Sequence, residues 1–132
     1  MKDGITMTML NALTQSPATI AESLSDYWSP RVIAEFDDNY IKVAKLKGSL
    51  VWHSHDLEDE MFLILKGELE IELREEVIYL KTGDIFVVPA GVEHNPVAQE
   101  ECLVMLIEKK VTKHTGNVEH PKSKSVASQR IE

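Results

Sequence analysis

Two histidines separated by one residue, His53 and His55, are followed five positions later by Glu60. Side chains at positions i and i+2 of an extended segment lie on the same face, so both imidazoles project to one side. A tight turn through residues 56–59 would fold the carboxylate of Glu60 back toward them. Imidazole and carboxylate groups that converge in this way are suitable ligands for a divalent metal ion. The sequence therefore predicts a metal site at this hairpin.

The segments that must position these side chains are expected to be short β-strands. From residue 31 onward, apolar and polar residues alternate with a period of two, and turn residues such as Asp37-Asp38-Asn39 separate the runs. Short strands at close spacing indicate an all-β sandwich or barrel, and we expect jelly-roll closure. The predicted strands are 31–36, 40–46, 50–55, 60–65, 68–73, 77–80, 85–89 and 102–107.

One helix is expected before the strands. Ile20, Leu24 and Tyr27 recur at helical spacing, Ser16 is a suitable N-cap, and Pro17 would occupy the first helical position. After residue 109 only scattered apolar residues remain, which predicts a tail that is poorly ordered or draped on the surface. We therefore divide the chain into an N-terminal segment with a short helix (1–29), a β-barrel (30–110) and a polar C-terminal tail (111–132).

Composition narrows the classes of function. The 132 residues, 43% hydrophobic and 27% charged, are typical of a single globular domain. A net charge of −8 argues against partners such as nucleic acid or an anionic membrane surface, which basic patches recognise. No apolar run reaches the length of a membrane-spanning helix. A single cysteine and the lack of a signal-peptide pattern predict a cytoplasmic protein without an internal disulfide.

A second motif begins sixteen residues after Gly67, at Gly83. Together the two stretches resemble the paired motifs of the cupin superfamily, G-x5-H-x-H-x3,4-E-x6-G and G-x5-P-x-G-x2-H-x3-N. Two positions depart from the pattern: Gly48 lies one residue too close to His53, and Ala98 replaces the final asparagine. The resemblance covers about residues 40–108 and is typical of small single-domain microbial cupins of the conserved-barrel type. The matching positions are His53, His55, Glu60 and Gly67 in the first motif and Gly83, Pro89, Gly91 and His94 in the second.

This resemblance implies a double-stranded β-helix, or jelly-roll, barrel with one divalent metal ion inside it. The ligands it implies are His53, His55, Glu60 and His94. This donor set is compatible with Fe, Mn, Zn, Ni, Co or Cu and does not select among them. Four protein ligands around an octahedral ion would leave two positions open for a small molecule, whereas a tetrahedral ion would be closed and structural.

The expected function is action on a small polar molecule at this metal. One alternative is an oxidoreductase that resembles a dioxygenase, and another is an isomerase or epimerase that polarises a carbonyl group. A third is a non-catalytic module that binds or senses a small ligand in the same cavity. Isomerisation would need a proton carrier inside the barrel, for which Tyr40, Lys42 and Tyr79 are candidates by residue type alone.

Other residues are interpreted as structural. His114 and His120 fall in the predicted tail and are expected to be solvated. Cys102 begins an apolar strand without an identifiable activating base, so we expect a small buried hydrophobe. Trp52 and Met61 are expected to be ordinary packing residues, although together with Leu50 and Leu63 they could form an apolar dimer face. We also expect a homodimer.

Overall fold

The structure is a computed structural model that describes residues 11, 13–116, 118, 120–125 and 127–129. The first ten residues of the predicted N-terminal segment therefore lie outside the described part. None of the helices in these ranges is long and apolar enough to cross a membrane. The elements are α1 (Pro17–Ser23), β1 (Arg31–Phe36), β2 (Asn39–Ser49), β3 (Glu60–Lys66), β4 (Glu68–Leu73), β5 (Val77–Lys81), β6 (Ile85–Val88), β7 (His94–Lys109) and the 3₁₀ helix η1 (Ala127–Gln129).

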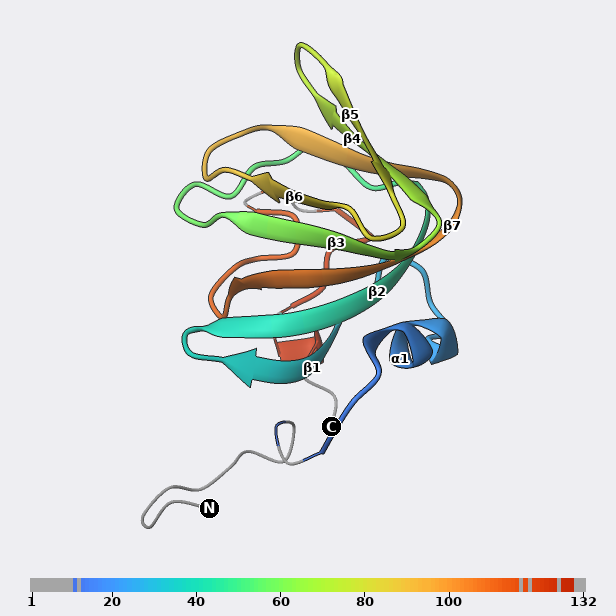
Figure 1. The fold of residues 1–132 in the computed structure, drawn as a ribbon. Coiled ribbons are helices and arrows are strands. Elements are labelled where there is room, and N and C mark those ends of the chain that lie inside the picture. Colours follow the sequence, from blue (N-terminus) through green and yellow to red (C-terminus); the bar gives the residue numbers. More distant parts are fainter. Residues whose placement is uncertain (1–10, 12, 117, 119, 126, 130–132) are drawn as a thin grey trace.

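The strands form one curled antiparallel sheet in the order β1-β2-β7-β3-β6, and β4 pairs with both β5 and β7 (Figure 1). Strand β7 joins the parts of the barrel, because it pairs with β4 near its start, with β3 over its second half and with β2 along most of its length. A straight strand of its 16 residues would span about 50 Å, so β7 must bend to stay within a small domain. The predicted all-β jelly-roll barrel with a short N-terminal helix is confirmed.

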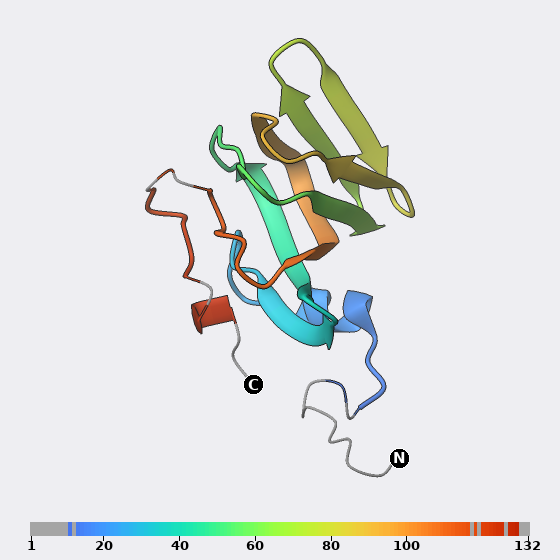
Figure 2. The same ribbon diagram turned by 90° about the vertical axis from the view of Figure 1, so that its left-hand side faces the viewer.

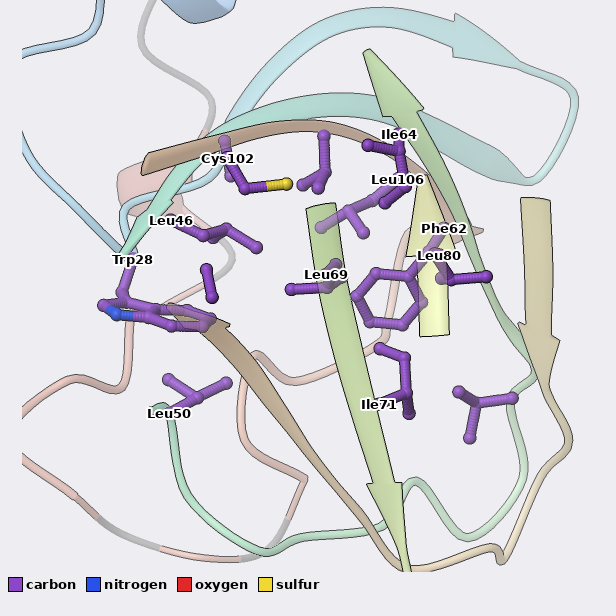
Figure 3. Close-up of a cluster of buried hydrophobic side chains, with 14 residues drawn as sticks. Trp28, Leu46, Leu50, Phe62, Ile64, Leu69, Ile71, Leu80, Cys102 and Leu106 are labelled. Atoms are coloured by element: carbon purple, nitrogen blue, oxygen red, sulfur yellow. The ribbon is translucent and has the colours of Figure 1, made fainter. Parts of the chain in front are cut away.

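The barrel interior contains a cluster of 14 buried apolar side chains (Figure 3). They come from inward-facing positions, for example Phe62 and Ile64 on β3, which alternate with outward-facing residues. Cys102 belongs to this cluster and is fully buried, as predicted. Leu50 also belongs to it, which excludes Leu50 from the alternative of an apolar dimer face.

Helix α1 packs on the outside of the barrel. Ala21 contacts a second apolar cluster that includes Ile33, Val43 and Leu103, from β1, β2 and β7. Pro17 starts the helix as predicted, but the helix ends at Ser23, before the predicted position Tyr27. Tyr27 instead forms an isolated bridge with Lys45 of β2, so the chain is already extended where it reaches the barrel.

Three predicted strands differ from the structure by more than one residue at an end. The last strand was predicted as 102–107, but β7 already begins at His94. Strand β2 continues to Ser49, because the chain passes Gly48 through a register irregularity with a positive φ of 82°. The predicted strand 50–55 is wrong, since this segment is a loop whose one β-type contact is the bridge between His53 and His94. The reason is that His53 pairs with a single residue of β7, while the neighbouring residues turn away to reach β3.

Candidate metal centre

Three segments bring four potential ligands together. His53 and His55 lie in the loop between β2 and β3, Glu60 is the first residue of β3, and His94 is the first residue of β7. The backbones of His53 and His94 hold each other, because the N–H of His53 donates to the carbonyl of His94 (3.0 Å) and the reverse bond is 2.9 Å. All four side chains are buried, and one ligand atom from each lies within 4.8 Å of the others.

The hydrogen bonds of two imidazoles set their tautomers. Nδ1 of His53 lies 2.8 Å from the carbonyl oxygen of Val51, and Nδ1 of His94 lies 2.9 Å from that of Val92. A carbonyl oxygen can only accept, so each Nδ1 carries the proton and donates it. In the neutral ring the lone pair is then on Nε2, which is the arrangement found in metal-bound histidines.

The donor atoms fit a divalent metal ion. Nε2 of His55 and Nε2 of His94 lie 3.7 and 3.5 Å from Oε1 of Glu60, distances too long for a good hydrogen bond. Both Nε2 atoms are buried and have no hydrogen-bond partner among the described residues. Ligands about 2.1 Å from one ion are at most about 4.2 Å apart, so binding would draw the widest-spaced donors together by some tenths of an ångström. Buried, unpartnered lone pairs around a carboxylate therefore favour a cation.

Burial also shapes the charges of this cluster. Burial lowers the pKa of His53 to about 4, and the neighbouring His94 adds to the effect, so the ring is neutral and able to ligate at pH 7. Burial would raise the pKa of Glu60, but the interactions of its carboxylate with Glu108, His55 and His94 outweigh this effect and hold that pKa well below the ordinary value. The site thus presents a neutral imidazole beside an ionised carboxylate.

A buried carboxyl group, Glu108, and a buried amino group, Lys42, lie next to Glu60. Glu108 of β7 pairs with Glu60 of β3 in the strand register, and Nζ of Lys42 lies 2.7 Å from Oε1 of Glu108. Burial, the negative charge of Glu60 and a hydrogen bond to it raise the pKa of Glu108 well above its ordinary value, although Lys42 opposes the shift. Glu108 is therefore the member of the carboxyl pair with the higher pKa, and Lys42 supplies a fully buried positive charge beside it.

The three predicted proton carriers are placed very differently. Lys42 points into the barrel, where it contacts Glu108 and the side-chain oxygen of Gln129. Tyr40 is buried, and its ring lies 6.0 Å from Nζ of Lys42. Tyr79 is 69% exposed on β5, so it is not an interior group.

The chain after β7 packs against the barrel. We call residues 111–116, 118, 120–125 and 127–129 the C-terminal strap; Figure 2 shows it on the side of the barrel away from β4 and β5. Thr112, Thr115 and Gln129 are buried, and Nζ of Lys122 donates to the carbonyl of Ser49. The strap therefore makes specific contacts with the barrel.

The prediction that His114 is solvated is wrong. The strap places His114 beside a small cavity that is also lined by His53 and Glu60. Burial lowers the pKa of His114 to about 4, and the negative charge of Glu60 opposes this shift. Periodicity could not reveal this position, because it depends on the path of an irregular segment. His114 is therefore a fifth polar residue next to the four candidate ligands.

Comparison with known proteins shows a matching family model and a similar crystal structure. The cupin-domain family model matches residues 40–108, more than half of the 132-residue chain. A crystal structure of a cupin-2 domain-containing protein from Shewanella frigidimarina is 45% identical, with a TM-score of 0.65, and the match covers 67% of this chain and 86% of that one.

Two relatives with described roles are also similar. The pectin degradation protein KdgF of Dickeya dadantii is 30% identical over 87 residues, or 64% of this chain and 79% of that protein. The 3-hydroxyanthranilate 3,4-dioxygenase of Bacillus cereus is 37% identical over 60 residues, or 42% of this chain and 34% of the enzyme. With the family model, the fold and the motif spacing in agreement, the chain belongs to the cupin family.

Proposed function

We propose that this chain is a metal-dependent enzyme that moves a proton on a small, oxygen-rich acid. The proposed ligands of a single divalent ion are His53, His55, Glu60 and His94. The observation that carries the proposal is the pair of buried, unpartnered Nε2 atoms of His55 and His94 that face the carboxylate of Glu60. When bound, the ion would act as a Lewis acid toward a carbonyl or hydroxyl oxygen of the substrate.

Two buried ionisable residues next to Glu60, Lys42 and Glu108, support proton transfer as the reaction type. Lys42 and Glu108 form a buried pair 2.7 Å apart, and Glu108 is matched with Glu60 across β3 and β7. Buried pairs of this kind are costly to keep, because desolvation offsets much of their attraction. Their role in the proposal is to hold a proton and a positive charge next to Glu60, so that its carboxylate keeps one orientation and one charge state.

The substrate class is supported by the relatives. Among the named relatives, the pectin degradation protein is matched over most of its own length, whereas the dioxygenase is matched over 34% of its length. Pectin is built from sugar acids, which carry a carboxylate and several hydroxyl groups. A divalent ion with open positions binds such oxygen atoms well. We therefore favour small sugar acids and keto acids as substrates.

Two observations favour other functions, namely oxygen chemistry and the binding of a very small ligand. The 37% identity to the dioxygenase spans 60 residues and favours oxygen chemistry as a second candidate. The cavity beside His53 and Glu60 has a volume of about 20 Å³, enough for about one water molecule, which favours a module that binds a very small ligand. A substrate larger than this would require some of the residues that line the cavity to move.

One experiment separates these functions. Protein purified without a metal-affinity tag would be loaded with Mn²⁺, Fe²⁺, Ni²⁺ or Zn²⁺ and incubated with small sugar and keto acids in D₂O. We expect deuterium to enter the substrate in a metal-dependent way, measured by proton NMR, without consumption of dioxygen. His94→Ala, which removes one ligand, is the matched control and should show no exchange. Dioxygen uptake would contradict the proposal in favour of the oxygenase, and binding without exchange would favour the module.

A further inference from the structure

The C-terminal strap holds His114 in place through its own backbone. The N–H of Lys124 donates to Nδ1 of His114 at 3.1 Å. The strap itself is tied to the barrel, because Lys122 donates to the carbonyl of Ser49 and Gln129 bonds to the buried Lys42. His114 is therefore a positioned side chain of the strap, although it lies after the last strand.

The hydrogen bond from Lys124 determines the tautomer of His114. A backbone N–H can only donate, so Nδ1 of His114 must be unprotonated and the neutral ring carries its proton on Nε2. His53 and His94 have the opposite arrangement, with the proton on Nδ1 and the lone pair on Nε2. The three rings thus divide into two that can ligate a cation through Nε2 and one that offers an Nε2–H donor.

The ring of His114 lines the cavity next to the candidate ligands. His53 and Glu60 are the other polar residues that line this cavity, and the rest of its lining is apolar. Its volume of about 20 Å³ holds about one oxygen atom with its hydrogens. Because the strap engages Nδ1, Nε2 is the ring nitrogen that is available to donate to a ligand. Within the described part of the chain, no hydrogen bond engages Nε2 of His114.

We infer that His114 donates its Nε2–H to the oxygen atom that occupies this cavity, and that the site selects ligands with an anionic oxygen at this position. The inference rests on the proposed metal site, since that oxygen would be the one bound at the ion. A hydrogen bond to a charged oxygen is stronger than one to a neutral oxygen, so the donor would favour carboxylates, alkoxides or hydroxide over neutral ligands. In this assignment His114 is not a fifth ligand.

The strap can be displaced without changing any of these side chains. Gly116 has a φ of +58°, and a Cβ atom at this position would lie 1.9 Å from the carbonyl oxygen of Ser54. Gly116→Ala must therefore push the strap away from the loop that holds His53 and His55. If the inference is correct, this substitution should weaken ligand binding in the same way as removal of the His114 ring.

The first test reads the tautomers directly by ¹⁵N NMR of the histidine rings in the metal-free and Zn²⁺-loaded protein. We expect His114 to show protonated Nε2 and unprotonated Nδ1 in both forms, the reverse of His53 and His94. A His114 ring with the proton on Nδ1, or an Nε2 resonance shifted by zinc to that of a ligand, would overturn the inference. This measurement needs no variant and no activity.

The second test measures binding of fluoride, an anionic acceptor about the size of a water molecule, to the Co²⁺-loaded protein by visible absorption. His114→Phe is expected to keep one cobalt per chain and to weaken fluoride binding by about 10-fold or more. His114→Gln, which retains an N–H donor, should keep the affinity within about threefold. Gly116→Ala should resemble His114→Phe.

The outcomes distinguish the inference from the proposed function. Equal fluoride affinity in wild type and His114→Phe would overturn the donor role, and so would loss of cobalt from His114→Phe, which would make His114 a ligand. Absence of bound cobalt in the wild-type protein would overturn the proposed function, and with it the ligand-binding role of His114.

Discussion

The barrel interior has an apolar half and a polar half, built from the same strands. On β3 the inward side chains run from Ile64 and Phe62 to Glu60, and on β7 they run from Leu106 to Glu108. The strands do not change direction or pairing between the two halves, since Phe62 pairs with Leu106 just as Glu60 pairs with Glu108. The apolar half (Figure 3) therefore fixes the geometry that holds ionisable side chains together in the polar half.

The difference between the apolar and polar halves indicates which of them stabilises the fold. Burial of apolar side chains is favourable, at roughly 1.5–3 kcal/mol for each large residue. Buried charges instead cost several kcal/mol each unless partners compensate them. We therefore expect the apolar half to provide stability and the polar half to depend on complete pairing, with a bound cation as part of that pairing.

The largest effect on folding is expected from Lys42→Met. This substitution leaves the carboxyl pair of Glu60 and Glu108 buried without its cation, and removal of one partner of a buried pair costs about 3–5 kcal/mol of unfolding free energy. The double variant Lys42→Met/Glu108→Leu should recover part of the loss, because one of the two buried carboxyl groups is removed together with the cation. Urea unfolding of the three proteins measures this. A double variant no more stable than the single one would show that packing of Lys42, and not its charge, is what matters.

A somewhat smaller loss is expected from Ile71→Ala in the apolar half. Ile71 is fully buried in the interior cluster, and truncation there should cost about 2–4 kcal/mol through lost burial and a residual cavity. The metal stoichiometry should not change, because Ile71 is not a ligand. Loss of metal in this variant, at a temperature where it remains folded, would contradict the separation of the two halves.

The third effect, which builds up gradually with decreasing pH, is the pH dependence of the metal-free protein. The pKa values of His53 and His114 are about 4 in the folded chain, against 6.5 in the unfolded chain. Between these values the unfolded chain binds more protons, so stability is complete above pH 6.5 and falls as the pH decreases toward 4. The loss is up to roughly 3 kcal/mol for His53 and less for His114, which is only partly buried. Unfolding curves that are flat between pH 6.5 and 4.5 would show that these rings are not buried as neutral groups.

The fold and the four candidate ligands could be predicted from the sequence because each rests on local spacing. The alternation of apolar and polar residues predicts most of the strands. The spacing of the motifs predicts the four candidate ligands, of which one ligand atom each lies within 4.8 Å of the others: His53, His55, Glu60 and His94. The loop at residues 50–55 was mistaken for a strand, because its alternation reflects the burial of His53 and His55 and not a hydrogen-bonded ladder.

The alternation of the strands also predicts that two further polar residues, Glu108 and Lys42, face the interior. Glu108 has the same parity as Val104 and Leu106 on β7, and Lys42 has the same parity as Ala44 on β2. An ionisable residue that continues an inward apolar series is expected to face the interior. His114 carried no such signal, since its position depends on contacts such as that of Gly116 with Ser54, which join distant parts of the chain.

The most direct test of the proposed metal centre is elemental analysis of the protein. The protein would be purified without a metal-affinity tag and, if necessary, reloaded with metal after chelation. The proposed site predicts one divalent transition-metal ion per chain in the wild-type protein and in Ile71→Ala. It predicts that His94→Ala and Glu60→Gln lose this ion, together with the thermal stabilisation that the ion provides. A wild-type protein that binds no ion, or variants at His94 and Glu60 that retain a full equivalent, would contradict the assignment of the metal centre.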